Sequence, residues 1–303
     1  MKRVEQLIDM ARKLSNNTSY DSNSGVTQDV FVQYLNNAQD SLLKEVVNLK
    51  CKYLMKQAFV TVVSGQEKYD YPSDLYMQHI DTIQWLDQQQ GTYYQTLYKS
   101  YTKEKVTTTS SYPFGYILQN DGYHLNPPIS NGILQLTYIK KVPRLQKRAG
   151  QVSAVTINGS NQITALSVST TGSYDEAQIN DDYFLCVVDK YGQQKAVNVE
   201  YTSVSGGVFT LSPFTLASGE TVTVGDYICV GKNSVNIPQW DDICESYLIK
   251  HMVYDAKYSD SSQWSKEAKQ DMADSFVQLS GSFATLSDDL SSIPITNLDI
   301  IGF

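Results

Sequence analysis

The spacing of hydrophobic positions changes along the chain, and its first part is helical in character. One apolar stripe repeats every three or four positions and predicts a short amphipathic helix over 2–14. A second stripe runs from Val30 to Leu49 and predicts a long helix that Thr27 can cap. Each stripe occupies one side only, so both helices must pack against other parts of the protein.

From about residue 57 the apolar period shortens to two, which is typical of β-strands. We predict strand, corner and strand over 58–86, with Pro72 holding the corner because its ring restricts φ. The sequence Asn120-Asp121-Gly122 predicts a hairpin turn. A helix near 93–103 also fits the pattern. The segment is therefore expected to be β-rich as far as a basic linker that ends at Gly150.

Residues 151–235 show no helical period. Short β-prone runs alternate here with closely spaced turn sequences, which predicts a compact antiparallel sandwich or barrel. The turn sequences are Asn158-Gly159-Ser160, Lys190-Tyr191-Gly192, Ser205-Gly206-Gly207 and Ser218-Gly219.

Helical character returns after Ile237, where Pro238 suits the first turn of a helix. A seam of large apolar residues then predicts a last helix over about 262–290. Its members are Trp264, Ala268, Met272, Phe276, Leu279, Phe283, Leu286 and Leu290. With helices at both ends, we predict an α+β fold: a helical bundle formed by the N- and C-terminal helices, with antiparallel β modules inserted into it.

Five segments follow from these patterns. The expected order is the N-terminal helices, the β-rich segment with its basic linker, the sandwich or barrel, the C-terminal helices and an apolar tail. Their expected bounds are 1–57, 58–150, 151–235, 236–290 and 291–303.

The composition fits a folded protein. Of 303 residues, 41% are apolar and 18% are charged, and the net charge of −8 argues against a general nucleic-acid binder. Formal charge is +4 over 1–150, −5 over 151–235 and −7 over 236–303. This asymmetry suggests surfaces that face different neighbours, although drift on a solvated surface gives the same pattern.

Targeting signals are not expected. The N-terminal residues lack the apolar region of a signal peptide, and no run is long enough to cross a membrane. The cysteines are scattered without CxxC spacing, which fits buried thiols in a reducing cytoplasm. They are Cys51, Cys186, Cys229 and Cys244.

The sequence carries no motif of an active site. The three histidines, His79, His124 and His251, lie far apart and lack metal-ligand spacing. The pairs Asp181-Asp182 and Asp241-Asp242 could be acid/base couples or metal ligands, but turn and helix-start roles explain both more simply. We therefore expect no catalytic residue, no metal ion and no cofactor.

A dense basic run is the first candidate interaction site. Five cationic residues fall within nine positions of an acidic protein, and we hypothesise that they contact an acidic surface of a neighbouring subunit or the backbone of passing DNA. A solvated linker is the alternative. The residues are Lys140, Lys141, Arg144, Lys147 and Arg148.

The apolar tail is the second candidate. It has no periodic partner, so it either folds back on its own domain or docks on another chain by strand addition or by filling a groove. Pro294 and Gly302 make a continued helix unfavourable. The docking residues would be Ile293, Ile295, Leu298, Ile300, Ile301 and Phe303.

The order of several short stretches resembles the head-to-tail adaptor (connector ring) proteins of tailed bacteriophages, particularly short-tailed and crAss-like phages. The resemblance covers about 25–145 and 235–290 and rests on pattern and order. The stretches are "YLNNAQ" at 34–39, "VVSGQEKYDYPSDLY" at 62–76, "IDTIQW" at 80–85, "YPFGYILQNDGYHLNPP" at 112–128, "LQLTYIKKVPRL" at 134–145 and "IPQWDDICESYLIKHMVYDAKYSDSS" at 237–262.

This resemblance implies a virion structural protein at the head–tail junction, assembled in the host cytoplasm, and not an enzyme. Such adaptors form a homo-oligomeric ring, expected to be a dodecamer, that docks below the portal protein. The ring extends the channel through which DNA passes without sequence recognition, offers a platform to tail proteins, and has no membrane partner. The C-terminal arm is expected to serve as its anchor.

Two alternatives stay open. The chain could be a different virion component, such as a tail, fibre-attachment or capsid-decorating protein, or an enzyme with a β accessory domain. The predicted module at 151–235 departs from the smallest adaptors, so its role does not carry over from the resemblance.

Overall fold

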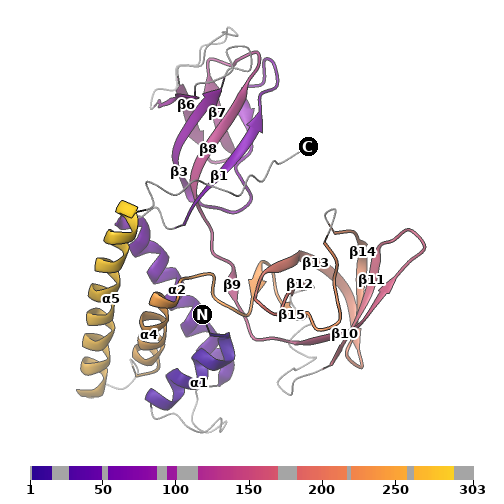
Figure 1. Cartoon of the computed structure of the whole chain (residues 1–303), viewed down its shortest axis with the longest axis vertical. Helices are drawn as coiled ribbons and strands as arrows, with labels where there is room; N and C mark the ends of the chain where they lie inside the picture. Colours follow the sequence, from indigo (N-terminus) through magenta and orange to yellow (C-terminus); the bar gives the residue numbers. More distant parts are fainter. Residues whose placement is uncertain are drawn as a thin grey trace. The chain divides into compact units, whose positions relative to one another are not determined.

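The structure is a computed structural model that describes 2–15, 27–49, 54–86, 94–100, 115–169, 183–216, 220–257 and 263–289. These residues form two compact units, and most of their elements are labelled in Figure 1. The helix–barrel unit comprises the described residues within Met1–Glu45 and Pro143–Gly281. The β unit comprises those within Val46–Val142 and Ser282–Phe303.

The predicted N-terminal helix is confirmed as α1 (Val4–Leu14). Its start is fixed by Gln6, whose side-chain oxygen accepts a hydrogen bond from the Arg3 backbone N–H at 3.0 Å. The expected stripe faces inward, because Leu7 and Ile8 are fully buried, whereas Leu14 at its end is exposed. The buried side of α1 contacts α4 (Glu245–Lys257).

The longer predicted helices are also present. The second is α2 (Gln28–Asn48), and the last is α5 (Gln263–Asp289). Figure 1 shows α4 and α5 side by side, and the ring of Tyr247 on α4 meets that of Phe276 on α5 edge-on, with centroids 5.8 Å apart. Part of the predicted seam of α5 is buried, at Ala268, Leu279 and Phe283.

The β unit is built from two four-stranded sheets. One has the order β1-β8-β3-β4 and the other β2-β7-β6-β5. The first sheet consists of β1 (Met55–Thr61), β8 (Ile133–Lys140), β3 (Leu75–Leu86) and β4 (Tyr94–Thr96). The second consists of β2 (Lys68–Tyr69), β7 (Gly122–Asn126), β6 (Gly115–Gln119) and β5 (Tyr98–Lys99). The helix expected near 93–103 is therefore wrong over its described residues, which form β4 and β5.

The predicted hairpin turn joins β6 to β7 as expected, with Gln119 opposite Gly122. Gly122 adopts a φ of 149°, and a Cβ at this position would collide with the carbonyl oxygen of Tyr69. Glycine is thus required for the close approach of β2. The ring of Tyr69 stacks on that of Tyr123 within the unit, with centroids 5.6 Å apart.

Asp74 holds the corner that precedes β3. One carboxylate oxygen accepts a hydrogen bond from the Tyr138 hydroxyl at 2.6 Å, and the other lies 3.3 Å from the Lys56 ammonium. The carbonyl of Pro72 accepts from the Leu75 N–H at 3.0 Å, which closes the turn. The corner is therefore positioned by side chains of two other strands of the sheet, Lys56 of β1 and Tyr138 of β8. Tyrosines near it serve this packing, because Tyr76 and Tyr138 are buried.

A closed six-stranded barrel occupies the second half of the chain, in the order β10-β11-β14-β13-β12-β15. Its strands are β10 (Gly150–Ile157), β11 (Ile163–Ser169), β12 (Phe184–Val188), β13 (Gln194–Ser205), β14 (Val208–Phe214) and β15 (Tyr227–Val230). Alternate residues fill the interior, among them the fully buried Leu166, Leu185 and Phe209. The intervening Cys186 and Cys229 pair across β12 and β15 and are free, buried thiols, as expected.

The expected fold class is wrong. Strands make up 41% of the structure and helices 30%, so the protein is mainly β, and the described helices are not a bundle into which β modules are inserted. Periodicity shows which face of a helix is buried but not what covers it. The Val4 N–H at the start of α1 donates to the carbonyl of Asn236, which lies in a bend outside the helices. The proposed five-segment division of the chain stays a prediction.

The buried contact between α4 and α5 generates a prediction on pH dependence. Burial, with the Glu45 and Asp255 carboxylates, raises the pKa of Tyr247 to about 12 from its ordinary value of 10.0. The folded state therefore keeps this proton above pH 10, and the resulting stability is complete below pH 10 and is lost as pH rises through about 12. The free energy of unfolding should fall more steeply in this window for the wild type than for Tyr247→Phe, by at most about 1.4 kcal/mol per pH unit.

Urea unfolding of both proteins from about pH 9 to about pH 11.5 measures the difference, with lysine titration common to the two. Parallel curves for wild type and variant would show that the Tyr247 hydroxyl is not protected in the folded state.

Candidate functional site

The basic run lies where β8 leaves its sheet and the chain enters the helix–barrel unit. After Pro143 it forms β9 (Arg144–Leu145), which pairs in parallel with β16 (Ser234–Val235). The Arg144 N–H donates to the carbonyl of Asn233 at 2.8 Å, and the Gln146 N–H donates to that of Val235 at 2.9 Å. The predicted linker is thus partly a strand, bonded along one edge.

Two amide side chains of α2 bind the other edge of this strand. Asn36 acts as a strand would: its Nδ2 donates to the carbonyl of Leu145, and its Oδ1 accepts from the Leu145 N–H, both at 2.9 Å. Gln39 Nε2 donates to the carbonyl of Pro143 at 2.9 Å. Residues three apart share one face of a helix, so both amides reach the same extended segment. We call Asn36 and Gln39 the amide clamp.

A third stretch of the chain completes the amide clamp. Trp240, which is buried, donates from its indole Nε1 to Oε1 of Gln39 at 3.2 Å. Gln39 is 2% exposed, so both ends of its amide are matched inside the protein. Three stretches that lie far apart in the sequence, "YLNNAQ", "KKVPRL" and "IPQW", therefore meet at one place.

The clamp residues were not singled out from the sequence. A signal was present, because Asn36 and Gln39 flank Ala38 on the apolar stripe of α2, and buried amides demand hydrogen-bonding partners. Their partners lie more than 100 positions away, as the separations of 104 and 109 for the Pro143 and Leu145 bonds show. Local pattern could not identify them.

Two cations of the basic run are bound within the chain. Lys147 Nζ lies 2.6 Å from Oδ1 of Asp29 on α2. Arg148 contacts Glu5 of α1 twice, because its backbone N–H and its Nε donate to Oε1 at 2.9 and 3.2 Å. The Arg148 guanidinium also lies 4.7 Å from the centroid of the Tyr227 ring on β15. These residues join the helices to the barrel.

The other three cations differ from this pair. Arg144 and Lys141 are exposed, and Lys140 is half-buried. Burial, together with the neighbouring Lys56 ammonium, lowers the pKa of Lys140, while Asp74 acts in the opposite direction. The basic run is also divided between the two units, because Lys140 and Lys141 belong to the β unit. The five cations therefore have different surroundings within their own units, and their shared contact with an acidic surface or DNA stays a prediction.

Some of the remaining candidates lie outside the described residues, and the others have local roles. The six tail residues from Ile293 to Phe303 lie outside the described residues, as does the Asp181-Asp182 pair. Asp241 caps a helical turn, since its Oδ1 accepts from the Ile243 N–H at 3.2 Å. His79 stacks on Tyr76, and His251 lies 3.4 Å from Asp255.

Two properties of the described residues bear on the class of site. Within the described ranges, no group of three or more histidine, cysteine or carboxylate side chains could hold a metal ion. None of the described helices has the length and hydropathy needed to cross a membrane.

The division of the basic run predicts two different outcomes for the same loss of charge. The variant Lys147→Gln/Arg148→Gln loses two partly buried ion pairs. Its free energy of unfolding should be about 1–3 kcal/mol lower than that of the wild type. The matched variant Lys141→Gln/Arg144→Gln alters exposed side chains only. Its free energy of unfolding should lie within about 0.5 kcal/mol of the wild-type value. Urea unfolding distinguishes them, and equal destabilisation would contradict the division.

Comparison with known proteins identifies the family. Residues 2–190 match the family model described as SU10 adaptor protein, a stretch that contains α1, α2, the strands of the β unit, β9 and the first three barrel strands. No curated protein matches the chain. Because the family match covers more than half of the chain, the protein belongs to the SU10 adaptor protein family and is a structural adaptor protein of a bacteriophage virion.

Proposed function

We propose that this adaptor docks below the portal protein and forms a ring that extends the DNA channel and bridges to tail proteins at the head–tail junction. The ring is a homo-oligomer, expected to be a dodecamer, and DNA passes through it without sequence recognition. Its role is mechanical rather than catalytic. The protein assembles in the host cytoplasm before it becomes part of the virion.

The observation that carries this proposal is the adaptor family match over 2–190. The amide clamp contributes a physical argument, because Asn36 and Pro143 both fall within the match. A connector holds one neighbouring protein in a fixed position relative to the next. Its own segments must therefore be rigidly positioned. A strand bonded along both edges between α2 and β16 provides such a connection inside the helix–barrel unit.

Exposed cations supply a second argument. Arg144 and Lys141 are exposed at the start of the connecting segment, whereas Lys147 and Arg148 already have carboxylate partners. We propose that Arg144 and Lys141 contact an acidic surface of a neighbouring subunit or the DNA backbone in the channel. Such contacts weaken as salt screens the charges.

The apolar tail is proposed as the anchor on the portal. Burial of one isoleucine or phenylalanine side chain contributes about 1.5–3 kcal/mol, so burial of several offsets the cost of ordering a short segment. Deletion of 291–303 should leave a folded, soluble protein that no longer joins the portal. Circular dichroism measures the folding, and electron microscopy of the deletion protein mixed with purified portal measures docking.

Two results would contradict the anchor. If the deletion unfolds the protein, the tail belongs to its own core. If the deletion protein still occupies the particle at the level of the wild type, the tail is not the docking element. Wild-type protein that forms no ring and binds no portal in the same images would contradict the proposed function itself.

A further inference from the structure

Two neighbouring strands of the closed barrel, β13 and β14, diverge at one end. β13 pairs with β14 only from Tyr201, opposite Leu211, to the hairpin end at Ser205 and Val208. Pro213 follows in β14 and has no N–H to continue the ladder, and Asn198 in β13 has a φ of 55°. The two strands separate beyond the Tyr201–Leu211 pair for these reasons.

Where the two strands diverge lies a groove of about 410 Å³, a volume within the range of ligand sites. We call it the barrel groove. One wall is 195–200 of β13, and the other is 212–216 at the end of β14, with Glu220 beside them. Val197 is exposed at 46%, and Phe214 and Leu216 pack against the barrel core. A groove between two strands, with apolar side chains along it, fits an extended segment of chain.

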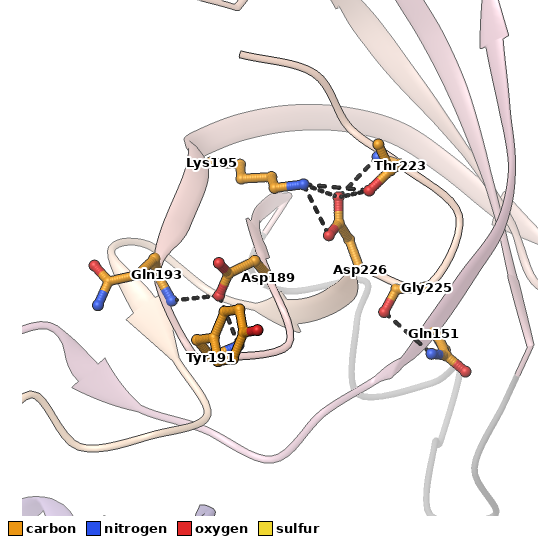
Figure 2. A network of polar contacts seen from close by, with 8 residues as sticks. All are labelled: Gln151, Asp189, Tyr191, Gln193, Lys195, Thr223, Gly225 and Asp226. Atoms are coloured by element: carbon orange, nitrogen blue, oxygen red, sulfur yellow. Dashed lines mark hydrogen bonds and ion pairs between the residues drawn. The ribbon is translucent and has the colours of Figure 1, made fainter.

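The charge in the groove is negative. Lys195 is compensated, because its Nζ lies 3.0 and 2.8 Å from the two carboxylate oxygens of Asp226 (Figure 2). Asp226 also accepts from the Thr223 N–H at 2.7 Å, so its position is set by the backbone. Glu200 accepts a hydrogen bond from the Ser212 hydroxyl at 3.3 Å. Neither Glu200 nor Glu220 has an ion pair with any described residue.

Figure 2 shows how Lys195, the one cation among the described residues that line the groove, is held by Asp226. Asp189 orders the preceding turn, since its Oδ1 accepts from the backbone N–H groups of Tyr191 and Gln193 at 2.8 and 2.9 Å. β13 begins directly after this turn and carries Lys195 to Asp226. Lys195 is held by Asp226. Glu200 and Glu220 therefore keep their negative charge at the groove without an ion pair to a described residue.

We propose that the barrel groove binds an extended peptide segment bearing lysine or arginine from a partner protein. Its cationic side chains pair with Glu200 and Glu220, and its apolar side chains contact Val197 and the exposed parts of Phe214 and Leu216. The charge of the whole segment 151–235, −5, favours the same class of partner. This binding site does not depend on ring formation or on contact with the portal.

The test uses the full chain and a short fluorescent peptide in which lysine alternates with valine. Fluorescence anisotropy should show saturable binding that weakens with salt. The variant Glu200→Gln/Glu220→Gln keeps the size of both side chains. It should bind the lysine peptide at least about ten-fold more weakly than the wild type. Thr215→Trp fills the groove and should abolish binding while the melting temperature stays unchanged. A peptide of alternating glutamate and valine should not bind.

The variant Asp40→Asn/Asp271→Asn is the matched control, because it removes two exposed carboxylates from helices. It should bind the lysine peptide as the wild type does. Equal weakening in both double variants would show general charge attraction and would overturn the proposal. It would also be overturned if the wild type did not bind, or if Thr215→Trp bound normally.

Discussion

The helix–barrel unit depends on one constraint: the extended segment after Pro143 must satisfy backbone hydrogen bonds on both of its edges. β16 supplies one edge, and the side chains of Asn36 and Gln39 supply the other. An unpaired buried backbone group costs about 1–3 kcal/mol, so loss of either edge is expensive. The amide clamp thereby ties the path of the chain to α2, and Trp240 ties α2 in turn to the segment before α4.

Ion pairs reinforce this arrangement. Exposed cations and exposed carboxylates also lie on different elements. Lys147 and Arg148 bind carboxylates of α2 and α1, so they hold the segment against these two helices. Arg144 and Lys141 stay exposed, and we propose that they contact an anionic neighbour. On the barrel the sign reverses, because Lys195 is held by Asp226 while Glu200 and Glu220 face a groove. An adaptor with cationic and anionic contact regions on separate elements can meet two different neighbours.

Local chemistry made some elements predictable and left others hidden. Asn120-Asp121-Gly122 specifies its hairpin because glycine alone fits the backbone there, and the stripe of α1 specifies a buried face. The stretch 94–100 forms strands because its pairing with β3 and β6 determines its conformation. Its local sequence pattern, which suggested a helix, does not. The prediction of a helical bundle was wrong because the apolar stripe of a helix does not reveal which element covers it. The amide clamp was hidden for the same reason, as it joins residues more than 100 positions apart.

Amide hydrogen exchange at Leu145 tests the central role of the clamp most directly, because this N–H donates to the Asn36 side chain alone among the described bonds. In the variant Asn36→Ala we expect exchange at Leu145 to accelerate strongly, while the Gln146 N–H, which donates to Val235, loses less protection. The barrel core should exchange as in the wild type. Unchanged protection of Leu145 in this variant would contradict the account.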